Sequence, residues 1–139
     1  MRPSGGYISR VSITSFVARP LLAGMFVYGG LDAVRNPAGK VPRAEKVAPD
    51  IADLVGIDAD TEQLVQFNGL VQVVAGTTLA LGILPRLSAL ALAGSLVPTT
   101  LAGHRFWDEE DDAARGQQTI QFLKNAAMLG GLLLVVEHG

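Results

Sequence analysis

The chain has 139 residues, of which 49% are hydrophobic and only 17% charged, and its mean hydropathy is positive. This length allows one domain, and a net charge of −2 gives no indication of nucleic-acid binding. The chain contains no cysteine, which excludes disulfides, a thiolate nucleophile and cysteine-ligated iron–sulfur clusters.

The apolar residues occur in blocks, and the charged residues lie between them. The first block, residues 11–34, predicts a membrane span that contains Arg19 near its start and Asp32 near its end. Proline is tolerated in the first turn of a helix, so Pro20 suggests that the buried part begins near Arg19. We expect the residues before Arg19 to continue into the lipid headgroups.

A long polar segment, residues 35–63, follows the first block and is interpreted as a loop. It contains three prolines, four basic residues and six acidic residues. Within it, Ile51, Leu54 and Val55 would share one face of a helix. The sequence therefore predicts a short surface helix over residues 48–55.

The next block, residues 64–84, carries no formal charge and predicts the second span. A bilayer core of about 30 Å requires roughly 20 apolar residues at about 1.5 Å per residue. Pro85-Arg86 is interpreted as a very short turn, which would place the third span, residues 87–103, antiparallel beside the second. We expect Pro98 to kink that third helix.

A polar segment, residues 104–118, precedes the last predicted span, residues 119–136. Phe106 and Trp107 suggest an aromatic anchor at the membrane surface, and five consecutive acidic residues follow them. The predicted fold is an all-α bundle of four transmembrane helices, forming a single domain over residues 1–139. Both termini then lie on one side, and the distribution of Lys and Arg slightly favours cytoplasmic loops.

The predicted topology brings polar residues together at the loop side of the membrane. We expect Asp32 to pair with Lys124, and Tyr28 to donate a hydrogen bond one turn away, because unpaired polar groups at this depth are costly. Either these residues only close the bundle, or they bind a polar head such as a quinone ring or a lipid headgroup, with His104 as proton donor. The residues expected at this level are Asp32, Gln66, Asn68, His104, Lys124 and Asn125.

Arg19 belongs to the opposite side, at a depth similar to that of Arg86 and Glu137. It either reaches the headgroups or pairs with Glu137, or it binds an anionic ligand or lipid. His104 and His138 would lie on opposite membrane faces, which argues against a bis-histidine haem. No metal site is predicted, because the acidic run is best explained as a solvated surface.

Several segments together resemble the DoxX family of small four-helix membrane proteins, in its actinobacterial type. The first helix has Arg19 and a Gly29-Gly30 pair, and the second has spaced glycines before Pro85-Arg86. The most specific part is the closing block, H-x-F-W followed by F-L-K-N-x-A-x-x-G-G, over residues 104–131. The family-like polar residues are Arg19, His104, Lys124 and Asn125.

The resemblance implies a link to membrane oxidoreductase systems. One branch of the family is a subunit of a thiosulfate:quinone oxidoreductase. Another is a membrane partner that assembles superoxide dismutase and a thiosulfate sulfurtransferase in an oxidative-stress complex. Family-level analogy sets an expectation for this chain and does not assign an activity.

These observations favour an integral, multi-pass accessory subunit or scaffold of a redox-linked complex in a bacterial inner membrane, with other membrane proteins as partners. One alternative is a quinone-interacting oxidoreductase subunit, and another is a protein that binds or transports lipid or a small hydrophobic molecule. An autonomous enzyme is not expected, and neither an intrinsic cofactor nor a catalytic residue is assigned. A bound quinone is the one cofactor that the sequence suggests.

Overall fold

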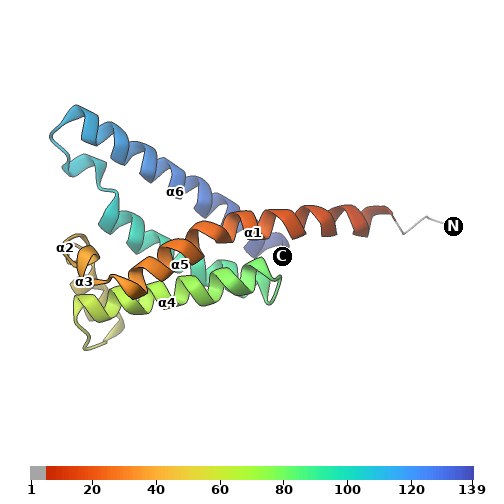
Figure 1. Cartoon of the computed structure of the whole chain (residues 1–139), viewed down its shortest axis with the longest axis horizontal. Coiled ribbons are helices and arrows are strands. Elements are labelled where there is room, and N and C mark those ends of the chain that lie inside the picture. The colour runs from red at the N-terminus through yellow and green to blue at the C-terminus, as the bar shows by residue number, and fades with distance from the viewer. Residues whose placement is uncertain (1–5) are drawn as a thin grey trace.

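The computed structural model describes the backbone of residues 6–139 and the side chains of residues 13–139, and Figure 1 shows its arrangement. All regular elements in the described part are helices, which confirms the all-α class. The long helices are α1 (Gly6–Arg35), α4 (Thr61–Ala80), α5 (Pro85–Gly103) and α6 (Asp112–His138). The short ones are η1 (Ala38–Lys40), α2 (Val41–Ala44), α3 (Ala48–Val55) and η2 (Phe106–Asp108).

Three segments of the described part are long and apolar enough to cross a membrane, and the expected number of four is not confirmed. They cover Ile13–Arg35, Pro85–Asp108 and Asp112–His138. Helix α4, which contains most of the predicted second span, is not among them. Its mean hydropathy is lowered chiefly by four amide side chains, those of Gln63, Gln66, Asn68 and Gln72.

The ends of α4 differ from those predicted because of local capping and turn geometry. Asp60 accepts a hydrogen bond from the backbone N–H of Gln63 at 2.8 Å, and the Gln63 side chain accepts one from the Asp60 N–H at 3.1 Å. This capping box starts the helix at Thr61 rather than at residue 64. At the other end the chain turns at residues 81–84, where Gly82 has φ +71°.

The predicted turn at Pro85-Arg86 is therefore wrong. Pro85 is the first residue of α5, a position where its fixed φ suits the helix and its missing N–H costs nothing. Helix α6 also begins earlier than expected, because the Asp111 carboxylate caps it by accepting a hydrogen bond from the Ala114 N–H at 2.9 Å. Residues 112–118, predicted as part of a loop, are consequently helical.

Helices α1 and α4 approach closely along a line of small residues. A Cβ atom built on Gly30 would lie 2.6 Å from the Gly69 carbonyl oxygen, and one built on Gly69 would lie 2.8 Å from the Gly30 carbonyl oxygen. About two turns further along α4, a Cβ atom built on Gly76 would lie 2.9 Å from a methyl group of Val27. Glycine at these positions lets the two backbones meet, as in many membrane helix pairs.

The apolar core lies where α1, α4, α5 and α6 come together. Its completely buried large side chains are Leu79 of α4, Leu92 of α5 and Leu132 of α6. Toward the end that carries α3, α6 diverges from α1 and α4, as Figure 1 shows. Near that end α6 instead packs on α5 and η2.

Both connecting segments lie at the same end of the molecule, as the predicted topology requires. Helix α3 occupies Ala48–Val55, which confirms the predicted surface helix. Lys46, from the first segment, lies 4.0 Å from the Asp108 carboxylate of the second. At the opposite end, the first turns of α1 project beyond the other helices (Figure 1).

Candidate functional site

Asn68 belongs to a polar network between α4 and α5. The Gln72 side-chain N–H donates to the Ser95 hydroxyl at 3.0 Å, and that hydroxyl donates to the Asn68 Oδ1 at 2.7 Å. The Asn68 Nδ2 in turn donates to the Thr99 hydroxyl at 3.0 Å. Gln72 and Ser95 are buried, and a Cβ atom on Gly30 of α1 would lie 2.9 Å from the Gln72 Cβ.

This network contains no ionisable group, so none of its side chains can act as an acid or a base near neutral pH. Its hydrogen bonds join residues one helical turn apart on α4 to residues one turn apart on α5, which fixes how the two helices are rotated and aligned. Gln72, Ser95 and Thr99 were not among the predicted site residues. The signal was present in the sequence, since Asn68 and Gln72 are spaced by four, as are Ser95 and Thr99.

Asn125 makes a second buried contact between helices, at the junction of α5 and α6. Its Nδ2 donates to the Thr100 hydroxyl at 3.0 Å, and that hydroxyl donates to the Leu96 carbonyl oxygen at 2.8 Å. Asn125 and Thr100 are both buried. Asn125 is therefore engaged in helix packing and lies apart from the Asn68 network.

His104 lies just beyond the end of α5 and contacts α6. Its Nδ1 is 2.9 Å from the Gln118 Oε1, and because an amide oxygen only accepts, this bond requires the proton on Nδ1. One turn further along α6, Phe122 packs edge-to-face on Phe106, with ring centroids 5.3 Å apart. With its proton on Nδ1, the neutral His104 imidazole has Nε2 as an acceptor. His104 can donate through Nε2 only when the ring carries a second proton.

The predicted aromatic anchor forms a cluster in the same region. Trp107 packs edge-to-face on Phe106 with ring centroids 5.1 Å apart, and the Arg105 guanidinium lies 5.3 Å from the Trp107 ring centroid. Arg105 also pairs with Asp108 at 2.7 Å. This cluster joins η2 to the side of α6.

The predicted ion pair between Asp32 and Lys124 does not form. Asp32 instead accepts hydrogen bonds from Lys40 at 2.5 Å and from Asn36 at 3.0 Å. Lys124 is exposed, and its Nζ donates to the Gln121 Oε1 at 2.6 Å. The physical reason is twofold: η1 brings Lys40 back to the end of α1, and α6 diverges from α1 at this end.

Tyr28 does not join Asp32 either. Its side chain is 76% exposed, so it points away from the helix contacts and toward whatever surrounds the protein. The residues expected to converge at the loop side are therefore distributed over separate sites, one at α4–α5, one at α5–α6 and one at the end of α1. Whether any of them binds a ligand stays a prediction.

Arg19 lies at the opposite end of the molecule, where α1 passes the turn between α4 and α5. Its Nη2 donates to the Gly139 backbone oxygen at 2.5 Å, and a Cβ atom on Gly82 would lie 2.9 Å from its Nη1. The predicted partner Glu137 is instead 3.5 Å from the neighbouring His138. Arg19 and Arg86 both lie near Gly139, at the same end of the molecule.

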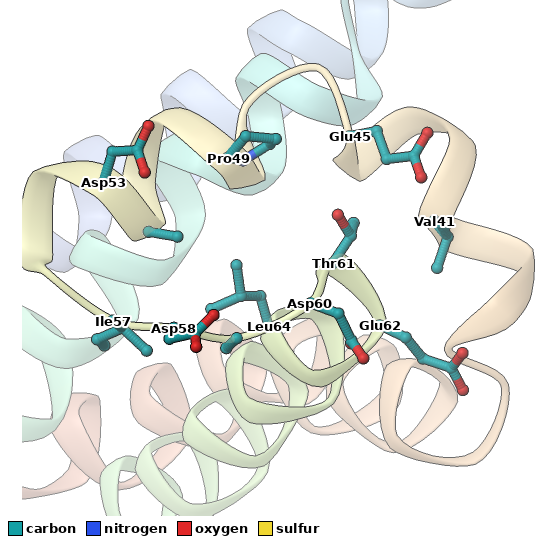
Figure 2. Close-up of a pocket in the computed structure, with 12 residues that line it drawn as sticks. Val41, Glu45, Pro49, Asp53, Ile57, Asp58, Asp60, Thr61, Glu62 and Leu64 are labelled. Carbon is teal, nitrogen blue, oxygen red and sulfur yellow. The ribbon is translucent and has the colours of Figure 1, made fainter.

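A shallow hollow of about 480 Å³, which was not predicted from the sequence, lies between α2, α3 and the first turn of α4. Figure 2 shows Thr61 and Leu64 directed into it from α4, with Pro49 across the gap. Five of its lining residues are acidic, namely Glu45, Asp53, Asp58, Asp60 and Glu62. Within the described residues, however, no three carboxylate or imidazole groups are arranged to hold a metal ion.

Comparison with protein families finds a match over most of the chain. The DoxX family model matches residues 14–105, from α1 to the segment after α5. The match ends before most of the closing block to which the resemblance gave the greatest weight. Comparisons with curated proteins and with solved structures find no match. Because the family match covers about two thirds of the 139 residues, the chain belongs to the DoxX family of membrane proteins.

Proposed function

We propose that this chain is a membrane-embedded accessory subunit that holds together a redox-linked protein complex in a bacterial inner membrane. The observation that carries the proposal is how little of α6 the chain itself buries. Of the 27 residues of α6, only Asn125 and Leu132 are buried. Its exposed large apolar side chains are Ile120, Leu123, Leu133 and Leu134.

Such a helix offers most of its circumference to lipid or to another membrane protein. Association of helices within a bilayer depends on close packing rather than on the exclusion of water. Gly130, on the outer side of α6, has no atom within 4 Å of a built Cβ, so a partner helix could approach closely there. The layer formed by α2, α3 and η2 exposes charged side chains beside Leu54 and Val55, and it provides a second surface that suits a partner outside the bilayer.

The experiment that tests this proposal is purification of the chain from its native membranes in mild detergent, followed by mass spectrometry of protein and lipid. We expect other proteins to co-purify in stoichiometric amounts. Gly130→Leu should reduce their recovery several-fold without affecting the fold, because the added side chain meets open space. Gly24→Leu, at an equally open position on α1, is the matched control.

A chain that purifies alone would contradict the scaffold proposal. So would partners that are lost equally in the Gly130 and Gly24 variants, because the loss would then not depend on α6. The identities of stoichiometric partners would name the pathway.

A quinone-interacting role is the second candidate, and the contacts of His104 favour it. The His104–Gln118 bond and the Phe106–Phe122 contact are neighbouring contacts between the segment after α5 and α6. An imidazole beside aromatic rings suits a planar quinone head. Recovery of one quinone per chain, without partner proteins, would favour this role. Recovery of one lipid species would instead favour a lipid-binding or transport role.

We also propose that α4 is the fourth span. The amide groups of Asn68 and Gln72 are hydrogen-bonded to α5, so they would not face lipid unpaired. The low mean hydropathy of α4 therefore overstates the free-energy cost of inserting this helix into a bilayer. Insertion of α4 and α5 as a hairpin would place the turn at residues 81–84 on the side of the chain termini. The native sequence has no cysteine, which makes single-cysteine labelling a clean test.

We expect Ile83→Cys to react with a membrane-impermeant maleimide from one side of sealed vesicles, and Asp58→Cys from the other. Ile83 and Asp58 are both exposed, so accessibility in the folded protein is matched. Reaction of both cysteines from the same side would show that α4 does not cross the membrane.

A further inference from the structure

We infer that the Lys124 ammonium pairs with a carboxylate on a transmembrane helix of a partner subunit, and that this helix packs along the outer face of α6. The inference rests on the proposed accessory function and names the chemistry of the partner. The outer face consists of residues spaced by three or four, which therefore lie on one side of the helix, and each of them is exposed. They are Ile120, Leu123, Lys124, Ala127, Gly130 and Leu134.

Lys124 lies at the depth of the apolar helices. It belongs to Asp112–His138, which is long and apolar enough to cross a membrane. The next residue, Asn125, donates to Thr100, which lies in another such segment about one turn before α5 ends. A charged side chain in such a span is costly unless it is paired or reaches the membrane surface. The position of Lys124 therefore calls for a counter-ion.

The described part of the chain does not supply that counter-ion. The Lys124 Nζ donates to the Gln121 Oε1 at 2.6 Å, and this amide oxygen carries no net charge. None of the ion pairs within residues 13–139 includes Lys124, and Asp32 is paired with Lys40. The acidic side chains of α6 itself lie in its first and last turns. The carboxylate that would pair with Lys124 must come from another molecule.

The shape of the outer face favours a helix over a lipid as the source of the negative charge. Ala127 and Gly130 lie at its centre, and a Cβ atom built on Gly130 would meet nothing within 4 Å. Small residues allow a second helix backbone to approach closely, whereas acyl chains do not require them. At such a distance the long Lys124 side chain can reach an Asp or Glu of the second helix.

The charge also favours a different protein over a second copy of this chain. In a two-fold symmetric dimer the same surface of both copies forms the contact. Contact through the outer face of α6 would bring the two Lys124 ammonium groups toward each other, and like charges repel most strongly where water is excluded. The partner is therefore a different chain with an acidic residue in an apolar helix.

A model peptide tests the charge pairing directly. The probe is a synthetic Leu-Ala transmembrane peptide with a single Asp about one turn inside its apolar segment, and its association with the full chain is measured by fluorescence energy transfer in phosphatidylcholine vesicles. We expect it to bind about tenfold more tightly than the same peptide with Asn, because charge-assisted hydrogen bonds are the stronger ones. Lys124→Gln should reduce this preference to less than about twofold, and Lys124→Arg should retain it.

Arg86→Gln is the matched control, because it removes an exposed cation at the opposite end of the molecule. It should leave the preference for the Asp peptide unchanged. Equal loss in the Lys124→Gln and Arg86→Gln variants would indicate general charge attraction and would overturn the inference. So would equal binding of the Asp and Asn peptides to the unmodified chain.

Purification from native membranes separates this inference from the proposed function. We expect Lys124→Glu to lower the recovery of stoichiometric partner proteins several-fold, and Lys124→Arg to preserve it. Partners that Lys124→Glu retains would overturn the inference and leave the accessory function standing, whereas an unmodified chain that purifies alone would contradict both. Loss of one lipid species instead of a protein would show that Lys124 binds headgroups, which would also overturn the inference.

Discussion

Gly30→Ala is expected to destabilise the protein, whereas Gly24→Ala on the same helix is not. A Cβ atom at residue 30 would lie 2.6 Å from the Gly69 carbonyl oxygen and 2.9 Å from the Gln72 Cβ. The first obstacle is backbone, which cannot rotate away, so α1 and α4 must separate. Overpacking of this kind typically costs about 1–3 kcal/mol.

Gly24 provides the control because a Cβ atom there would meet nothing within 4 Å. Alanine is the better helix former by roughly 1 kcal/mol, so Gly24→Ala should be neutral or slightly stabilising. Both variants would be compared by denaturant-induced unfolding in mixed detergent micelles. Equal stability of the two variants would show that the α1–α4 contact is not as close as the structure indicates.

The Gly30 contact also shows what the sequence could not predict. Glycine is frequent in the apolar blocks, as is typical of closely packed membrane helices, but Gly24, Gly94 and Gly130 face open space. Which glycine lies at a contact depends on the rotation of each helix about its axis. That rotation is determined by all four long helices together, and a span with apolar residues on every side does not reveal it.

The same limit explains the outcome for the polar residues. Topology correctly placed Asp32, His104 and Lys124 toward one end of the molecule, but depth along a helix does not determine which residues face each other. Lys40, eight residues from Asp32, reaches it first because a local partner requires little chain entropy to bring into contact.

The starts of α4 and α6 were predicted too late in the chain, although the sequence contains the signals that mark them. Asp60 followed by Gln63 matches the capping-box pattern, and Asp111 precedes α6 as a typical N-cap. By contrast, the surface helix α3 was predicted with its correct bounds, because its apolar residues share one face. Hydropathy indicated the apolar blocks, and the local capping signals determine where their helices begin.

Leu132→Ala is expected to destabilise the protein and to loosen the contact between α6 and α1. Leu132 is completely buried in the cluster that also contains Leu79 and Leu92, and it is the one large apolar residue of α6 that is fully buried. Leucine-to-alanine changes in packed cores typically cost about 2–5 kcal/mol. Leu133→Ala removes the same atoms from a neighbouring side chain that is 53% exposed, so it should have little effect.

The contact between α6 and α1 gives this prediction a local measurement. A Cβ atom on Gly131 would lie 3.5 Å from a methyl group of Leu22, so cysteines at these two positions should cross-link efficiently in a chain that has no other cysteine. Adding Leu132→Ala should lower the cross-linking yield markedly, whereas adding Leu133→Ala should not. Toward residue 112 α6 diverges from α1, and another contact between the two helices is the bond from the Arg19 Nη2 to the Gly139 oxygen at the opposite end of α6. An unchanged yield would therefore mean that this bond, the Asn125–Thr100 bond and the α5 contacts fix α6 in place without Leu132.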